Sequence, residues 1–153
     1  MQTFAVDLSS LEAVKNVLLQ RLHPDRFVTA SALEKRIAQQ MSVQVNEAYR
    51  TLADDLLRAQ YLCKLKGFDV NEHRPMPADF LMLQMQWHEA LEACEQTGDE
   101  GARQRLFEEV KEHQRLLIAS LAKAFDTDHD DKAAFEATRE LMFVNKLITQ
   151  IQH

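Results

Sequence analysis

LHPDRF, at residues 22–27, separates two stretches in which apolar residues recur at helical spacing. Pro24 lacks a backbone N–H and disfavours α conformation in the residue before it, so the first helix must end near His23. The second helix resumes after a connection of about eight to ten residues. Two amphipathic helices with so short a connection predict an antiparallel hairpin.

Local signals set the expected helix ends in this half of the chain. Ser9 and Glu12 have the spacing of a capping box and predict the start of the first helix. Ser31, with Glu34, does the same for the second helix. A third helix is expected to begin at Asp54 or Asp55. Its apolar residues are Leu57, Tyr61, Leu62 and Leu65. Lys64 and Lys66 lie in its last turn, and Gly67 is expected to end it.

The second half of the chain begins after a break rich in proline. Residues 69–77 contain two prolines and little apolar surface, which predicts a domain boundary. Three more helices are expected after it, at about residues 78–96, 100–125 and 132–151, with Asp131 as the N-cap of the last. Their short connections predict an antiparallel three-helix bundle, so the predicted fold class is all-α.

Composition excludes several function classes. The 153 residues include only 3 glycines, too few and too scattered for a phosphate-binding loop. The net charge of −6 argues against a nucleic-acid binder, and no apolar run is long enough to span a membrane. The charge divides unevenly, because residues 1–68 carry +2 and residues 69–153 carry −8. Two surfaces with different partners are therefore expected.

Cys63 and Cys94 both fall within helical apolar patterns. Neither belongs to a Cys-x-x-Cys pair or a cluster with histidine, so a structural zinc site is not expected. Buried free thiols are the favoured interpretation, and they suit a reducing cytoplasm. No metal or cofactor is expected.

The context of His23-Pro24-Asp25 resembles a J domain, the module that stimulates the ATPase of DnaK-like chaperones. NEAYRTL follows at residues 46–52, LRAQYL at 57–62 and LKGFD at 65–69. These segments are similar to the HscB family of iron–sulfur co-chaperones, as are DFLM at 79–82 and RELMF at 139–143. The resemblance implies a J domain at residues 1–68, a linker at 69–77 and a scaffold-binding three-helix domain at 78–153.

The family resemblance also implies the roles of the loop. His23, Pro24, Asp25 and Arg26 would engage an HscA-like ATPase chaperone, assisted by Lys15 and Arg21 on the preceding helix. Pro24 stiffens the loop, so little conformational entropy is lost on docking. The chain itself would catalyse nothing. Asp25 is suited to a bidentate pair with a partner arginine.

The second domain would, by the same resemblance, bind an IscU-like iron–sulfur scaffold and deliver it to the chaperone. The implied docking residues are Leu81, Met82, Met85, Glu89 and Phe143. The first three share one helix face by their spacing, so plain bundle core is the competing interpretation. Gln86 and His88 depart from the family pattern, which has a carboxylate and an arginine at these positions to orient the scaffold, so the polar contacts are expected to differ. Trp87 could join this face or a domain interface.

J domains of this family normally begin with a short helix bearing aromatic residues. Here Met1 enters too late to supply it, and Phe4 to Asp7 resemble the connection after that helix. The expectation is a J domain without its first helix, with part of its apolar surface uncovered.

Three other functions remain open at this point. The chain could be a general J-domain protein with a different client. His23 and Asp25 could form the dyad of a hydrolase, although no nucleophile or oxyanion site is evident. The tripeptide could also be only a turn in a helical interaction module. Asp126, Asp128 and Asp130 imitate the start of a calcium loop, but the required turn glycine and final carboxylate are missing, so an acidic loop is expected.

Overall fold

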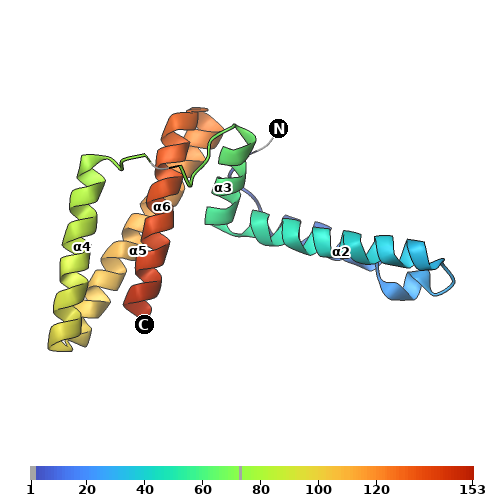
Figure 1. Cartoon of the computed structure of the whole chain (residues 1–153), viewed down its shortest axis with the longest axis horizontal. Helices are drawn as coiled ribbons and strands as arrows, with labels where there is room; N and C mark the ends of the chain where they lie inside the picture. Colours follow the sequence, from blue (N-terminus) through green and yellow to red (C-terminus); the bar gives the residue numbers. More distant parts are fainter. Residues whose placement is uncertain (1–2, 73) are drawn as a thin grey trace. The chain divides into compact units, whose positions relative to one another are not determined.

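The computed structural model describes residues 3–72 and 74–153, so Met1, Gln2 and His73 of the predicted segments lie outside it. The described residues form six α-helices and two short helical turns, and they contain no strand. Their order is α1 (Leu8–Arg21), the 3-10 turn η1 (Pro24–Phe27), α2 (Ala32–Ala53), α3 (Asp55–Leu65), α4 (Ala78–Thr97), α5 (Glu100–Ala122), the π-helical turn η2 (Lys123–Thr127) and α6 (Asp131–Gln152). The predicted all-α fold is confirmed (Figure 1).

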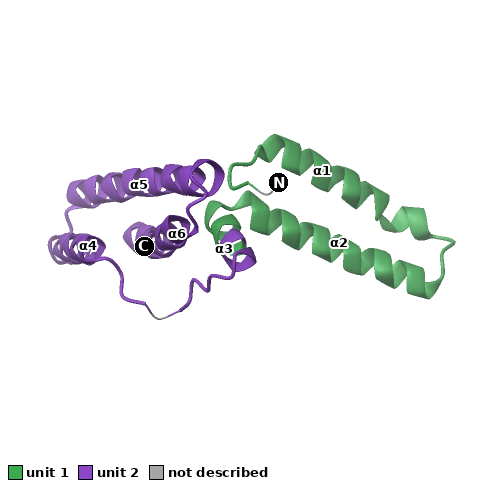
Figure 2. Cartoon of the chain, turned by 90° about the horizontal axis from the view of Figure 1, so that it is seen from above, with its two compact units in different colours: residues 1–61 green, residues 62–153 purple. Residues whose placement is uncertain are grey.

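The chain forms two compact units, residues 1–61 and 62–153, shown in different colours in Figure 2. The division falls within α3, earlier than the predicted boundary at residues 69–77. The reason is local packing of the segment that follows. Cys63 lies 3.5 Å from the Thr138 hydroxyl of α6, and the Phe68 ring lies 5.4 Å from that of Phe135. The end of α3 and the loop after it therefore belong with α6.

Two predicted N-caps are corrected by the structure. The cap of α1 is Asp7, whose carboxylate accepts hydrogen bonds from the backbone N–H groups of Ser9 and Ser10. The cap of α6 is Asp130, not Asp131, and its carboxylate accepts from the Ala133 N–H. In both cases an earlier aspartate has the extended backbone that a cap requires.

Other predicted ends are confirmed, except that of the fifth helix. Ser31 caps α2 by accepting from the Glu34 N–H at 3.1 Å. Gly67 and Gly98 adopt positive φ, at 85° and 67°, after α3 and α4. The fifth helix was expected to reach Phe125, but its regular part ends at Ala122 and continues as the π-helical turn η2.

In the first unit α1 and α2 form the predicted antiparallel hairpin (Figure 2). The hairpin buries little, because α1 has no buried residue and α2 has only Ala38. Val14, Leu18 and Met41 remain 39–56% exposed. These apolar side chains therefore remain largely open to solvent on the hairpin.

Arg58 of α3 joins three separate segments of the first unit. The residue is 4% exposed, and its guanidinium donates hydrogen bonds to the carbonyl oxygens of Phe4 and Leu52 and to the Asp55 carboxylate. The guanidinium also lies 4.4 Å from the centre of the Phe4 ring, which is itself 2% exposed. The arrangement satisfies a buried cation on all sides.

In the second unit α5 runs antiparallel to both α4 and α6 (Figure 1). The core is built mainly by α6, whose largest buried side chains include Phe135, Leu141, Leu147 and Ile151. A hydrogen bond of 2.8 Å between Gln114 and Asn145 also joins α5 to α6. The predicted three-helix bundle is confirmed.

We expect Arg58→Ala to lower the free energy of unfolding by roughly 3 kcal/mol, because two carbonyl oxygens would lose their partner in a buried site. Urea unfolding followed by far-ultraviolet circular dichroism measures this loss. Arg50→Ala is the matched control, since Arg50 forms an exposed ion pair with Glu47 and its removal should change the stability by about 0.5 kcal/mol at most. Equal stability of the two variants would show that the Arg58 contacts contribute little.

Candidate functional site

The loop after α1 is a tight turn fixed by its own hydrogen bonds. His23 is the N-cap of η1, with an extended backbone, and Pro24 is the first residue of the turn. The Asp25 N–H donates to Nδ1 of His23 at 3.2 Å, and the Arg26 N–H donates to the His23 carbonyl at 2.9 Å. The imidazole thus shapes the turn through one nitrogen and leaves Nε2 for another partner.

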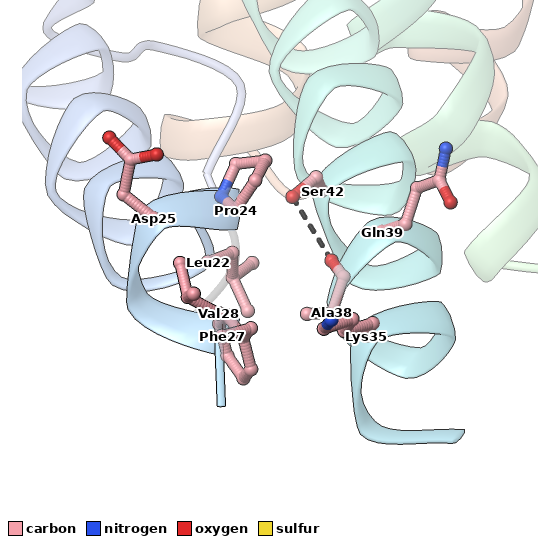
Figure 3. Close-up of a pocket in the computed structure, with 9 residues that line it drawn as sticks. All are labelled: Leu22, Pro24, Asp25, Phe27, Val28, Lys35, Ala38, Gln39 and Ser42. Carbon is pink, nitrogen blue, oxygen red and sulfur yellow. Dashed lines mark hydrogen bonds between the residues drawn. The ribbon is translucent and has the colours of Figure 1, made fainter. Parts of the chain in front are cut away.

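Asp25 is displayed by this turn with very little of its carboxylate covered. Its side chain is 90% exposed and that of His23 is 60% exposed. Figure 3 shows the carboxylate turned away from α2. A charged group on a stiff turn can pair with a cation of another protein without first breaking an internal bond.

The geometry does not favour a hydrolytic dyad. In such a dyad the carboxylate accepts a hydrogen bond from Nδ1–H of the histidine. Here Nδ1 of His23 is itself an acceptor, and it lies 3.6 Å from the nearer Asp25 carboxylate oxygen. Both side chains are open to solvent, so the water-excluded environment that strengthens catalytic electrostatics is missing at this pair.

The two basic residues expected to assist the loop have different surroundings. Arg21 lies exposed in the last turn of α1, next to the loop. The Lys15 ammonium lies 4.3 Å from the centre of the Tyr49 ring of α2, and Lys15 is half-buried. Lys15 therefore also braces the hairpin by a cation–π contact, which sequence spacing did not indicate.

On α4 the predicted docking residues point away from the bundle core. Leu81, Met82 and Met85 are 44%, 60% and 62% exposed, and Glu89 is exposed as well. The opposite face of α4 is buried and consists of Phe80, Trp87, Leu91 and Cys94. The competing interpretation of the three apolar residues as bundle core is therefore wrong.

Phe143 of α6 reaches the same neighbourhood from a different helix. Its ring lies 5.6 Å from the His88 ring and 5.8 Å from the Phe80 ring, in both cases edge to face. Contact with the exposed His88 places Phe143 beside the α4 face that carries Met85 and Glu89. His88 belongs to this surface although it departs from the expected family residue.

Trp87, which sequence could not place, belongs to the core of the second unit. It is 2% exposed, and its ring lies 5.1 Å from that of His113 and 6.4 Å from that of Phe80. Burial lowers the pKa of His113, opposed by the charge of Glu109. The Trp–His pair had no sequence signal, because the two residues are on different helices.

Cys63 and Cys94 are free and buried, as expected, and burial raises the pKa of the Cys63 thiol. Within residues 3–72 and 74–153 no group of three His, Cys, Asp or Glu side chains could hold a metal ion. The aspartates of the calcium-like pattern are used locally instead, since Asp130 caps α6 and Asp128 lies 4.0 Å from the Lys123 ammonium. In the same described part of the chain, no helix is both long and apolar enough to cross a membrane.

The second half of the chain matches a family model, and nearly the whole chain matches known relatives. Residues 76–152 match the family described as the HSCB C-terminal oligomerisation domain. A co-chaperone protein HscB homolog of Bordetella avium is 43% identical over 150 residues, which cover 97% of this chain and 88% of the relative. The chain belongs to the HscB co-chaperone family. The corresponding HscB homolog of an Azoarcus species is 40% identical over 97% of this chain and 85% of its own.

Two solved HscB structures share the whole fold. The chaperone HscB from Vibrio cholerae has a TM-score of 0.83 and 35% identity, over 98% of this chain and 89% of its own. The human co-chaperone protein HscB has a TM-score of 0.88 and 30% identity, over 98% and 75%. The hairpin with its His-Pro-Asp loop is accordingly the HscB J domain, and α4, α5 and α6 form the HscB C-terminal bundle.

We expect the bundle of this HscB-family chain to lose stability as the pH falls below about 6.5, the ordinary pKa of histidine. Because the pKa of His113 is lowered in the folded state, the unfolded chain binds more protons there, and stability rises with pH through this window. Urea unfolding followed by Trp87 fluorescence at several pH values measures the effect. Its slope is at most about 1.4 kcal/mol per pH unit, and less because solvent reaches part of the ring.

The variant His113→Asn isolates this effect from other titrations. The pKa of Glu140 is raised by burial and by Glu136, so that carboxyl acts in the opposite direction. Its contribution is the same in the wild type and in the variant and cancels in their difference. If the free energy of unfolding depended on pH in the same way in both proteins, His113 would not contribute to the pH dependence.

Proposed function

We propose that this chain stimulates the ATPase of an HscA-like chaperone through its His-Pro-Asp loop and brings an IscU-like scaffold to it for the maturation of iron–sulfur proteins. The observation that carries the first half is the loop itself. Asp25 is 90% exposed on a turn closed by the His23 ring and by Pro24. HscB relatives are named co-chaperones, which agrees with a regulator of another protein's activity.

On the chaperone, Asp25 would pair with an arginine, and His23 would donate from Nε2 to a nearby acceptor. Pro24 holds both groups in place, so the loop docks without a large loss of conformational entropy. Arg21, Arg26 and Lys15 would add attraction to an acidic chaperone surface, which raises the rate of association more than the final affinity.

The exposed face of α4 is proposed to bind the scaffold. Leu81, Met82 and Met85 present apolar surface to solvent, and methionine side chains adapt their shape to a partner. Phe143 and Glu89 would complete the contact at one edge, next to His88. The pairing of Phe143 with His88 suggests that an aromatic contact takes part of the orienting role that an arginine would have.

Holding both partners on one chain would compensate for modest individual affinities. Once the scaffold is bound, the chaperone meets it at a raised effective concentration. The proposal places this activity in the cytoplasm, where the buried thiols of Cys63 and Cys94 stay reduced.

Asp25→Asn should abolish ATPase stimulation while leaving the fold intact. The substitution keeps the size of the side chain and the Asp25 N–H bond to His23, but removes the charge. Breaking one half of a buried charge pair costs about 2–5 kcal/mol, or roughly 30-fold to several thousand-fold in affinity. Single-turnover ATP hydrolysis by the chaperone, with increasing co-chaperone, measures the loss.

A second loop variant and a control accompany that measurement. His23→Gln should fail in the same assay, because the glutamine cannot close the turn as the imidazole does. Glu47→Gln makes the same charge change at an exposed position on α2 and should stimulate normally. Normal stimulation by Asp25→Asn would refute the assigned role of the loop.

The double variant Leu81→Ala/Met85→Ala should weaken scaffold binding at least tenfold, because each side chain would bury apolar surface in the complex. Isothermal titration with purified scaffold measures the affinity. Both residues are exposed, so the helical signal and the Trp87 emission should not change. Leu116→Ala, at a leucine of α5 that is 50% exposed, is the control. An unchanged affinity in the double variant would rule out this face of α4.

A further inference from the structure

A pocket of about 630 Å³ lies between the His-Pro-Asp loop and the start of α2 (Figure 3). Its size is within the range of about 300–1,000 Å³ typical of ligand pockets, so it can hold at least one large apolar side chain. The loop contributes one wall and α2 the other. The residues that form these walls are Leu22, Pro24, Phe27, Val28, Ala38 and Ser42.

The loop wall is apolar and faces α2. Figure 3 shows Leu22, Phe27 and Val28 on the side of the loop nearest to Ala38. Val28 is 68% exposed, whereas Leu22 and Phe27 are half-buried. A cluster of three large apolar side chains around a hollow surface is typical of a site of protein contact.

The α2 wall includes two small side chains, those of Ala38 and Ser42, and the hydroxyl of Ser42 has a hydrogen-bond partner. Ala38 and Ser42 are one helical turn apart, so both face the pocket, and neither side chain fills it. The Ser42 hydroxyl donates to the Ala38 carbonyl at 3.0 Å, so its hydrogen is already bonded within the helix (Figure 3). An apolar side chain could therefore enter without leaving a buried donor unpaired.

The rim of the pocket carries charge of both signs. Asp25 lies on the loop side, and Lys35 lies on the first turns of α2. Pro24 and Asp25 belong both to the loop proposed to engage the chaperone and to the wall of this pocket. The loop residues that a partner would engage therefore also line the pocket.

We propose that the pocket receives an apolar side chain from the chaperone, on a segment that also carries a cation for Asp25 and a carboxylate for Lys35. This inference rests on the proposed function and adds a second, apolar point of attachment to it. Asp25 fixes where the partner segment lies, and the pocket anchors it. The charged pairs determine its direction across the loop.

The test blocks the mouth of the pocket without touching the His-Pro-Asp residues. Gln39 lines the pocket and is exposed, so Gln39→Trp places a large ring at the opening without disturbing a core. Gln40→Trp is the matched control, because Gln40 is exposed on the same helix and does not line the pocket. Circular dichroism checks that both variants keep the wild-type helical signal.

The readout is the co-chaperone concentration that gives half-maximal stimulation of the purified HscA-like ATPase. Gln39→Trp should raise it at least tenfold, since burial of one large apolar side chain is worth a decade or more in affinity. Gln40→Trp should match the wild type. A change below twofold in Gln39→Trp, or an equal loss in both variants, would overturn the pocket as an anchor.

A charge exchange provides an independent check. Lys35→Glu should weaken stimulation several-fold at low salt and less at high salt, whereas Arg36→Glu, outside the pocket, should have a smaller effect. The reverse order would overturn the proposed carboxylate partner. If Asp25→Asn stimulates normally, the proposed function fails together with this inference. If Asp25→Asn loses stimulation but Gln39→Trp stimulates normally, only the pocket inference fails.

Discussion

The buried guanidinium of Arg58 holds together a unit that has little other core. A two-helix hairpin cannot bury both of its apolar stripes by itself, and here α1 contributes no buried residue. The N-terminal segment at Phe4, the end of α2 at Leu52 and the start of α3 at Asp55 are joined instead through one side chain. A cation is costly to bury, but its planar fork of donors can satisfy two carbonyl groups and a carboxylate at once. The display of the His-Pro-Asp loop depends on the hairpin that this contact closes at its other end.

The second unit is stabilised by a different kind of contact. Its helices meet through continuous apolar packing along α6, and an aromatic group around Phe80 connects all three helices. The other side of α4, which carries Leu81, Met82 and Met85, takes no part in this packing. Methionines are tolerated on this free side because the bundle does not need them for its own stability. The J domain thus displays a charged residue on its loop, whereas the bundle displays an apolar face on α4.

Sequence predicted the fold where local chemistry decides it. Pro24 must stop a helix and Gly67 favours a left-handed end, so both ends were correct. The cap of α1 was misplaced because Asp7 and Ser9 can both accept backbone N–H groups, and only the path of the incoming chain selects between them. The site residues of the loop followed from a contiguous motif, whereas periodicity could not say whether Leu81 faces α5 or solvent. The pocket beside the loop could not be predicted from the sequence, because its shape depends on the position of the turn relative to α2.

The two nitrogens of His23 serve two different needs at one position. Nδ1 closes the turn by accepting from the Asp25 N–H, and Nε2 lies on the far side of a ring that is largely exposed. An asparagine is long enough to imitate only the inner nitrogen, and a glutamine reaches only as far as the outer one. Imidazole is the one natural side chain that places hydrogen-bonding atoms at both distances on a rigid plane. The shape of the loop and its contact with a partner are therefore encoded in the same ring, and a single substitution removes at least one of them.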